Sequence, residues 1–193
     1  MALTREDLWT LEDYSERRSA FRTEVLAHKK HRQVFLNEHA TLYFEDAVTM
    51  KYQIQEILRV EKIFTAAEIE EELEAYNPLI PDGTNWKATF MIEYPDAEER
   101  RGALARMANL EHTVWVQVGD TARVAAIANE DLERSTEEKT SAVHFLRFEL
   151  DAAQRQAARD GAELRMGIDH AALKCDVAVP GPVAASLAGD LTA

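Results

Sequence analysis

Three side chains able to bind a metal ion are spaced along the first stretch of predicted helix. Glu24, His28 and His31 stand four and then three residues apart, and side chains at these intervals project from one face of a helix. Two imidazoles and a carboxylate are a common ligand set for zinc or iron(II). These three residues are therefore the candidate metal site, and a divalent metal is the candidate cofactor.

The same stretch is also a cluster of basic residues. Lys29, Lys30 and Arg32 lie among the histidines, so a metal cation would have to bind inside a positive field. Positive side chains near the C-terminus of a helix are favoured by the helix dipole, and a simple cap would also explain them. We favour a cationic rim, formed by His28, Lys29, Lys30 and Arg32, that binds a small anion or an acidic partner.

A second polar set lies on the helix predicted for residues 47–64. Tyr52, Glu56 and Arg59 follow one another at helical intervals of four and three residues. A tyrosine, a carboxylate and an arginine on one face could orient a small anionic ligand or support a proton transfer. The interpretation we favour is structural, with Glu56 and Arg59 joined as an ion pair.

The remaining candidate residues are single residues or a pair, and none belongs to a longer motif. His144 shares a face of a predicted strand with apolar residues and is expected to be buried. Asp169 and His170 follow the end of another predicted strand, where binding residues often collect, although such a pair in a turn is usually structural. Cys175 has a lysine and an aspartate as neighbours, whose effects on a thiol pKa oppose each other, so a reactive thiol is not expected.

Several classes of protein are excluded by what the sequence lacks. One cysteine permits no intrachain disulfide and no cysteine-based metal cluster. There is no Gly-x-Ser-x-Gly elbow, no phosphate-binding loop and no dinucleotide-binding glycine pattern. There is also no Glu-x-x-His pair, which a di-iron helix bundle would need. Whether the protein is an enzyme therefore remains open at this point.

The chain is acidic, with 22 Lys and Arg against 35 Asp and Glu in 193 residues and a net charge of −13. Such a charge disfavours nucleic acid as a partner, because phosphate contacts need concentrated Lys and Arg. No window approaches the roughly 20 apolar residues of a membrane span, and the first residues do not form a secretory signal. We therefore expect a cytoplasmic protein that binds neither membranes nor nucleic acid, and a homo-oligomer is one option.

The hydrophobic pattern predicts the elements that must position these side chains. The first part is expected to hold a helix over 4–31, a hairpin of 33–36 with 41–45, the helix over 47–64 and a shorter helix opened by Thr65-x-x-Glu68.

The second part reads as strands interleaved with short helices. Strands are expected at 86–94, 113–118, 122–127, 142–150, 162–168 and 171–179, helices at 96–108, 151–161 and 183–191, and a polar loop at 129–141. These elements predict an α+β fold, with a mainly antiparallel sheet, helices packed on one face and a helical N-terminal region before it. We expect a single domain over 1–193, with an N-terminal portion of about 1–76 and a sheet portion of about 86–179. A ferredoxin-like split β-α-β is one candidate topology.

Five stretches together resemble an uncharacterised bacterial family that is classed as a domain of unknown function. They are His28-Lys-Lys30, Phe44-Glu-Asp46, Tyr52 to Arg59, Tyr76 to Gly83 and Glu138 to Phe148. Genes of this family often lie near genes for rubrerythrin-like proteins and an iron–sulfur oxidoreductase. The resemblance implies an accessory role in a redox or peroxide-stress module, with such a protein as partner. The alternative is a metal- or small-ligand-dependent enzyme that uses the His and Glu residues of the N-terminal half.

Overall fold

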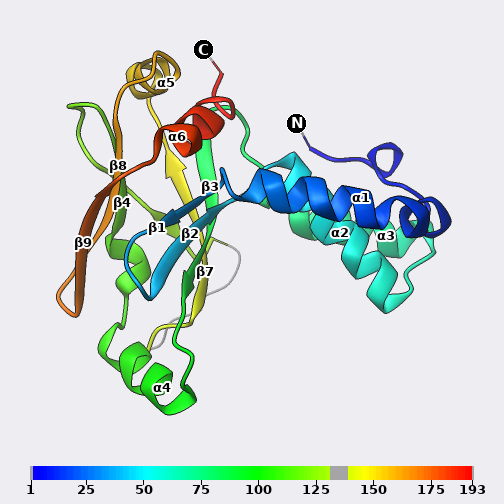
Figure 1. The fold of residues 1–193 in the computed structure, drawn as a ribbon, viewed down its shortest axis with the longest axis horizontal. Helices are drawn as coiled ribbons and strands as arrows, with labels where there is room; N and C mark the ends of the chain where they lie inside the picture. Colours follow the sequence, from blue (N-terminus) through cyan, green and yellow to red (C-terminus); the bar gives the residue numbers. More distant parts are fainter. Residues whose placement is uncertain (1, 131–138, 193) are drawn as a thin grey trace.

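Two antiparallel sheets and a projecting group of three helices make up the protein in a computed structural model, which describes residues 2–130 and 139–192 (Figure 1). The predicted α+β class is confirmed, but the strands form two sheets where the sequence suggests one. No ferredoxin-like arrangement results, because neither sheet contains strands joined by a helix and separated by one other strand. Most of the polar loop predicted at 129–141 lies outside the described residues.

The three projecting helices are called the helical arm: α1 (Leu11–Lys29), α2 (Ala47–Glu61) and α3 (Ala66–Tyr76). Their N-caps are Thr10, Asp46 and Thr65, each of which accepts a hydrogen bond from a backbone amide of the first turn. The first helix was expected to begin at Thr4. The capping box of Thr4 and Asp7 instead closes a single 3₁₀ turn, and α1 begins only after its own cap at Thr10.

The five-stranded sheet has the order β1-β2-β3-β7-β6. Its strands are β1 (Gln33–Phe35), β2 (Ala40–Phe44), β3 (Asn85–Ile92), β6 (Ile127–Ala128) and β7 (Val143–Glu149), and every neighbouring pair is antiparallel. The hairpin predicted from the first part of the chain is confirmed as β1 and β2. It belongs to the sheet, however, and not to the helical portion with which the sequence pattern groups it.

The four-stranded sheet has the order β5-β4-β8-β9. Its strands are β4 (Val114–Val118), β5 (Val124–Ala125), β8 (Leu164–His170) and β9 (Leu173–Ala178). The strand expected at 122–127 is split between the sheets, since β5 pairs with β4 whereas β6 pairs with β7. Ala126, which is buried between these two short strands, marks the crossing.

The main core lies between the two sheets and follows the alternation of β3. Trp86, Ala88 and Phe90 are buried on the inner face, while Lys87 and Thr89 lie on the outer face. The ends of the sheets are closed by α4 (Ala97–Arg106), α5 (Ala152–Arg159) and α6 (Gly181–Ala188), whose labels in Figure 1 mark the two ends. Among the described residues, no helix combines the length and apolar character needed to cross a membrane.

Candidate functional site

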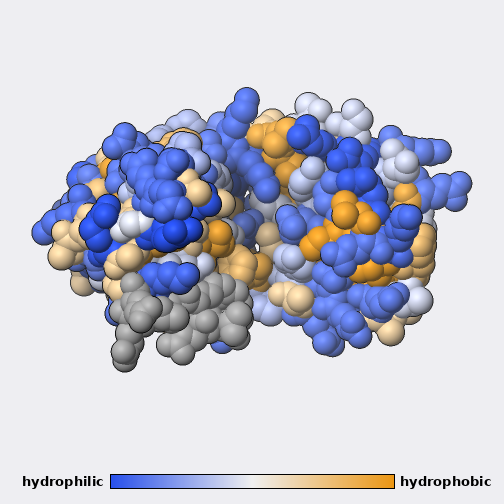
Figure 2. All heavy atoms as spheres, turned by 90° about the horizontal axis from the view of Figure 1, so that it is seen from below, coloured by the Kyte–Doolittle hydropathy of each residue, from blue (hydrophilic) through white to orange (hydrophobic). Residues whose placement is uncertain are grey.

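A cleft separates the helical arm from the outer face of the five-stranded sheet. It contains two neighbouring cavities, of about 560 Å³ and about 490 Å³. Glu45, Leu79 and Phe145 line both cavities, so the two cavities adjoin each other. Figure 2 shows the molecule hollowed between its two parts, with apolar residues at the base of the hollow. We call this site the cleft.

The larger cavity has walls from both parts of the molecule. Its arm side is formed mainly by α1, α2 and the end of α3, and its sheet side by alternate outward residues of β2, β3 and β7. Apolar and aromatic side chains predominate: Leu26, Tyr43, Met50, Tyr76, Leu79, Met91, Val143 and Phe145. Strand alternation explains the sheet side, since every second residue of a strand must leave the core.

Glu45 supplies a carboxylate where the two cavities meet. It stands between β2 and α2, just before the N-cap Asp46. Its Oε1 accepts a hydrogen bond of 2.7 Å from the Thr89 hydroxyl, and its Oε2 accepts one of 2.6 Å from the Thr49 hydroxyl. The side chain is half-buried, and these two bonds fix the orientation of the carboxylate.

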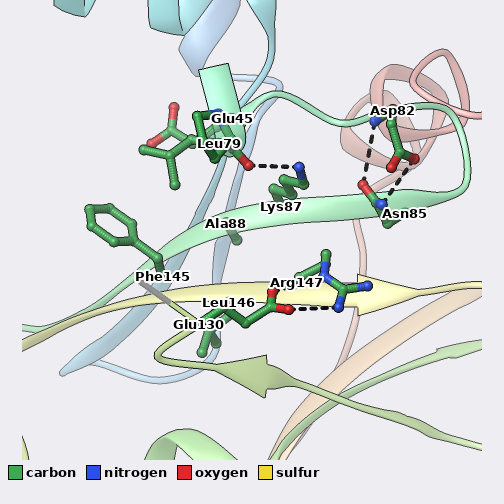
Figure 3. A pocket seen from close by; sticks show the side chains of 11 residues that line it. Glu45, Leu79, Asp82, Asn85, Lys87, Ala88, Glu130, Phe145, Leu146 and Arg147 are labelled. Carbon is green, nitrogen blue, oxygen red and sulfur yellow. Dashed lines mark hydrogen bonds and ion pairs between the residues drawn. The ribbon is translucent and has the colours of Figure 1, made fainter. Parts of the chain in front are cut away.

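The smaller cavity carries the charged side chains drawn in Figure 3. Lys87 donates a 2.6 Å hydrogen bond to the carbonyl oxygen of Pro78, and partial burial lowers the pKa of its ammonium group. Arg147 donates to both oxygens of Glu130, at 2.8 and 2.7 Å, and to Glu149 at 2.5 Å. The basic groups of this cavity therefore already have acceptors within the protein.

The predicted cationic rim is only partly at the surface. Lys29 and Lys30 line the larger cavity. Arg32 differs from the expectation, because its side chain is only 2 % exposed and donates to both Asp190 oxygens, at 2.9 and 2.7 Å. His28 contacts Asp46, with Nε2 and Oδ2 separated by 2.5 Å. Of the four residues of the predicted rim, the fold thus buries Arg32, whereas Lys30 is exposed and His28 and Lys29 are half-buried.

The candidate metal ligands do not form a coordination site in this geometry. Glu24 and His31 are exposed, and His28 is directed toward Asp46. Within residues 2–130 and 139–192, no group of three or more His, Cys, Asp or Glu side chains is arranged to hold a metal ion. The helical spacing of these residues is real, but the geometry gives a metal site no support.

The ion pair expected on α2 is present and belongs to a larger network. Glu56 accepts hydrogen bonds from Arg59 at 3.2 Å, Arg18 at 2.7 Å and the Tyr14 hydroxyl at 2.6 Å. The hydrogen bond from Arg18 is the main reason that the pKa of Glu56 falls to about 2. This network joins α1 to α2, and Tyr52 packs against Phe21 nearby.

The other candidate residues lie elsewhere in the molecule. His144 is fully buried, as expected, and its ring nitrogens lie 2.8 Å from the Thr140 hydroxyl oxygen and 3.2 Å from the Asn129 side-chain oxygen. Asp169 and His170 do not follow a strand, as the sequence suggested, but are the last two residues of β8, where they pair with β9. Asp169 is paired with Arg123, and His170 Nε2 lies 3.1 Å from a backbone carbonyl oxygen. These residues do not form one site with the α2 network.

The thiol of Cys175 is half-buried on β9, and burial raises its pKa. A raised pKa keeps the thiol protonated and unreactive near neutral pH. This agrees with the expectation drawn from its sequence neighbours.

The sequence reasoning missed the cleft because its walls meet through distant contacts. Thr49 follows Glu45 by four residues at a predicted helix start, and that spacing is a readable signal. Thr89 reaches the same carboxylate only because β2 pairs with β3 in a register that places Tyr43 opposite Thr89. A cross-strand register of this kind cannot be read from one sequence.

Comparison with known proteins gives a relative of the same fold. A crystal structure of a novel protein of unknown function from Burkholderia pseudomallei K96243 is 51% identical, with a TM-score of 0.94 and 100% of both chains covered. Among curated proteins, none matches this chain. The model of the family DUF3501, described as a protein of unknown function, matches residues 2–191. The chain therefore belongs to the DUF3501 family.

Proposed function

We propose that this protein is an accessory protein that binds a small organic ligand in the cleft. The observation that carries the proposal is the pair of cavities that share Glu45, Leu79 and Phe145. Small-molecule sites are concave, mostly apolar and contain a few fixed polar groups. The cleft has these properties, and cavities of about 560 and about 490 Å³ lie within the usual size range of such sites.

The setting of this role is a redox or peroxide-stress module. Support for the setting comes from the family resemblance, which implies a rubrerythrin-like protein or an iron–sulfur oxidoreductase as partner. Lys29 and Lys30 at the rim of the larger cavity are the side chains that we propose for contact with an acidic partner surface. Binding of a ligand beneath them would then be sensed at the same rim.

The test fills the cavity with a larger side chain. Val143 lies on the outer face of β7 and lines the larger cavity, so Val143→Trp should occupy ligand space. Ile127→Trp is the matched control, because Ile127 is 39% exposed on the same sheet and lines neither cavity of the cleft. A panel of organic amines, carboxylates and neutral aromatic compounds is screened by the shift in melting temperature.

At least one compound is expected to raise the melting temperature of the natural protein and of Ile127→Trp, but not that of Val143→Trp. If every stabilising compound acts equally on Val143→Trp, ligands do not bind in the cleft and the proposal fails.

A further inference from the structure

We infer that the cleft selects an organic cation, an amine attached to an apolar body, and that Glu45 binds its ammonium group. The inference rests on the proposed function and names the class of ligand. It follows from the bonding of Glu45, the rings that line the cavity and the state of the basic residues nearby.

Glu45 differs from the other bonded carboxylates of the arm and of its junction with the sheets. Glu56 is bound by arginines, Asp190 is bound by Arg32, and Asp46 contacts both Arg32 and His28. Within the part of the chain that the structure describes, the Glu45 carboxylate accepts hydrogen bonds from the hydroxyl groups of two threonines and from no other side chain. Between residues 2 and 130 and between 139 and 192, no basic nitrogen forms an ion pair with it.

This carboxylate has bonding capacity left over. Each carboxylate oxygen can accept two hydrogen bonds, and each Glu45 oxygen accepts one from a threonine. A ligand ammonium group, which donates up to three, would use the remaining acceptor positions. Because the carboxylate is half-buried beside apolar side chains, attraction to a cation is stronger there than at an open surface.

Aromatic rings line the cavities that Glu45 also lines. Tyr43 and Tyr76 line the larger cavity, and Phe145 lines both cavities. The faces of such rings attract cations, and the same rings bury the apolar body of a ligand. An amine with an aromatic or aliphatic body would therefore match the two components of the cleft.

An anionic ligand is the competing interpretation, and the positions of the basic residues speak against it. Three basic residues line the larger cavity: Lys30 is exposed at the rim, the Lys29 ammonium group lies over an aromatic ring, and Arg32 is held in an internal ion pair. Inside the smaller cavity, Lys87 is bonded to a backbone carbonyl and Arg147 to two glutamates. An anion would have to displace these acceptors, and it would also approach Glu45, a like charge.

The experiment uses three probes of similar size that differ in charge: 2-phenylethylamine, 2-phenylethanol and 3-phenylpropionate. Their binding to the full chain is measured by calorimetry near neutral pH, where the amine is protonated. The amine should bind most tightly. Glu45→Gln should weaken the amine by about tenfold or more, as expected for the loss of a charge-assisted hydrogen bond, and should change binding of the alcohol little.

The matched control is Glu93→Gln. Glu93 also accepts hydrogen bonds from a threonine and a tyrosine hydroxyl on the outer face of this sheet, but it lies outside the two cavities of the cleft. Amine affinity should be unchanged in this variant. The comparison of the three probes on the natural protein needs no variant, so the inference stays testable even if Glu45→Gln does not fold.

The inference is overturned if the alcohol or the carboxylate binds as tightly as the amine, if Glu45→Gln leaves amine affinity unchanged, or if the amine does not bind. If the alcohol or the carboxylate binds at least as tightly as the amine, and Val143→Trp abolishes that binding, the preference for a cation is rejected while the cleft is supported as the binding site. If none of the three probes binds, the cation is rejected, and the wider panel with Val143→Trp decides separately on the proposed function.

Discussion

The interface between the two sheets is filled almost entirely by apolar side chains, whereas the buried apolar cluster of the helical arm is small and consists of Ile54, Leu58 and Leu73. The arm compensates with polar contacts between its helices, such as the Glu56 network and the hydrogen bond of 2.6 Å from the Trp9 amide to the buried side chain of Gln55. The sheet region is thus stabilised chiefly by burial and the arm to a larger extent by directed bonds. Their responses to mutation and to pH should therefore differ.

The largest loss of stability is expected for a substitution in the core between the two sheets. Phe148 is fully buried and lies close to Phe44 in an aromatic cluster. Phe148→Ala should lower the free energy of unfolding by about 3–5 kcal/mol, because it removes buried apolar surface and leaves a cavity. Denaturation with urea measures this loss. Leu58→Ala in the arm should cost about 2 kcal/mol, at the low end for such changes, and a larger loss than for Phe148→Ala would contradict the comparison.

The second-largest loss of stability is expected where the arm meets the sheet region. Arg32 binds Asp190 at the end of α6 and the carbonyl oxygen of Glu45, so it ties the start of the arm to the sheet end. Arg32→Met should cost about 3 kcal/mol, since it leaves the buried carboxylate of Asp190 without its cation. Burial already raises the pKa of Asp190.

The double variant Arg32→Met with Asp190→Asn tests the reason for that loss. If the unpaired charge is the cause, the second substitution should restore part of the stability of the single variant. A double variant that is less stable than Arg32→Met would show that packing of the long side chain, and not its charge, is what the protein needs.

The smallest effect concerns acid stability in the arm. The pKa of Glu56 is lowered to about 2 in the folded protein, chiefly by Arg18, from an ordinary value of 4.5. A lowered pKa means that Glu56 stabilises the fold above pH 4.5 and that this contribution is lost as the pH falls toward 2. Glu56→Gln should remove this acid-sensitive part, on the order of 1 kcal/mol because Arg18 is partly exposed and solvent screens the pair.

Chemical denaturation at pH values between 2 and 6 measures that contribution. Tyr14→Phe is the control, because it removes one neutral donor to Glu56 and leaves the arginines in place, so most of the pH dependence should persist. An acid dependence in Glu56→Gln equal to that of the natural protein would mean that other groups control the acid response.

Local signals in the sequence predicted the elements well where capping chemistry is strong. The helices predicted at 96–108 and 151–161 start where expected, since Asp96 and Asp151 are the N-caps of α4 and α5, and Gly161 follows α5 with the positive φ that glycine readily adopts. Contacts between distant segments could not be predicted in the same way. The division into two sheets depends on the pairing of β5 with β4 and of β6 with β7, and the hydrophobic pattern of the sequence does not indicate either pairing.

The candidate site shows the same limit. The basic cluster predicted a binding surface because its residues are adjacent in the sequence, but the fold buries Arg32 in an internal ion pair. The spacing of Glu45 and Thr49 indicates one contact of this carboxylate, whereas its contact with Thr89 and its place in the cleft follow only from the tertiary structure. Functional residues assembled across a cleft are therefore found from tertiary structure, whereas clusters along the chain are as often structural.

The crossing at Ala126 constrains how the cleft can change shape. The backbone passes from the β4–β5 pairing to the β6–β7 pairing through this single residue, whose amide is itself bonded to the Val114 carbonyl. Sliding one sheet along the other by one residue, about 3.3 Å, would break hydrogen bonds on one side of the crossing. The chain therefore fixes the position of one sheet relative to the other at this crossing. We therefore expect the sheet wall of the cleft to be the stiffer of its two walls, and we expect a change in the width of the cleft to come from tilting of the helical arm.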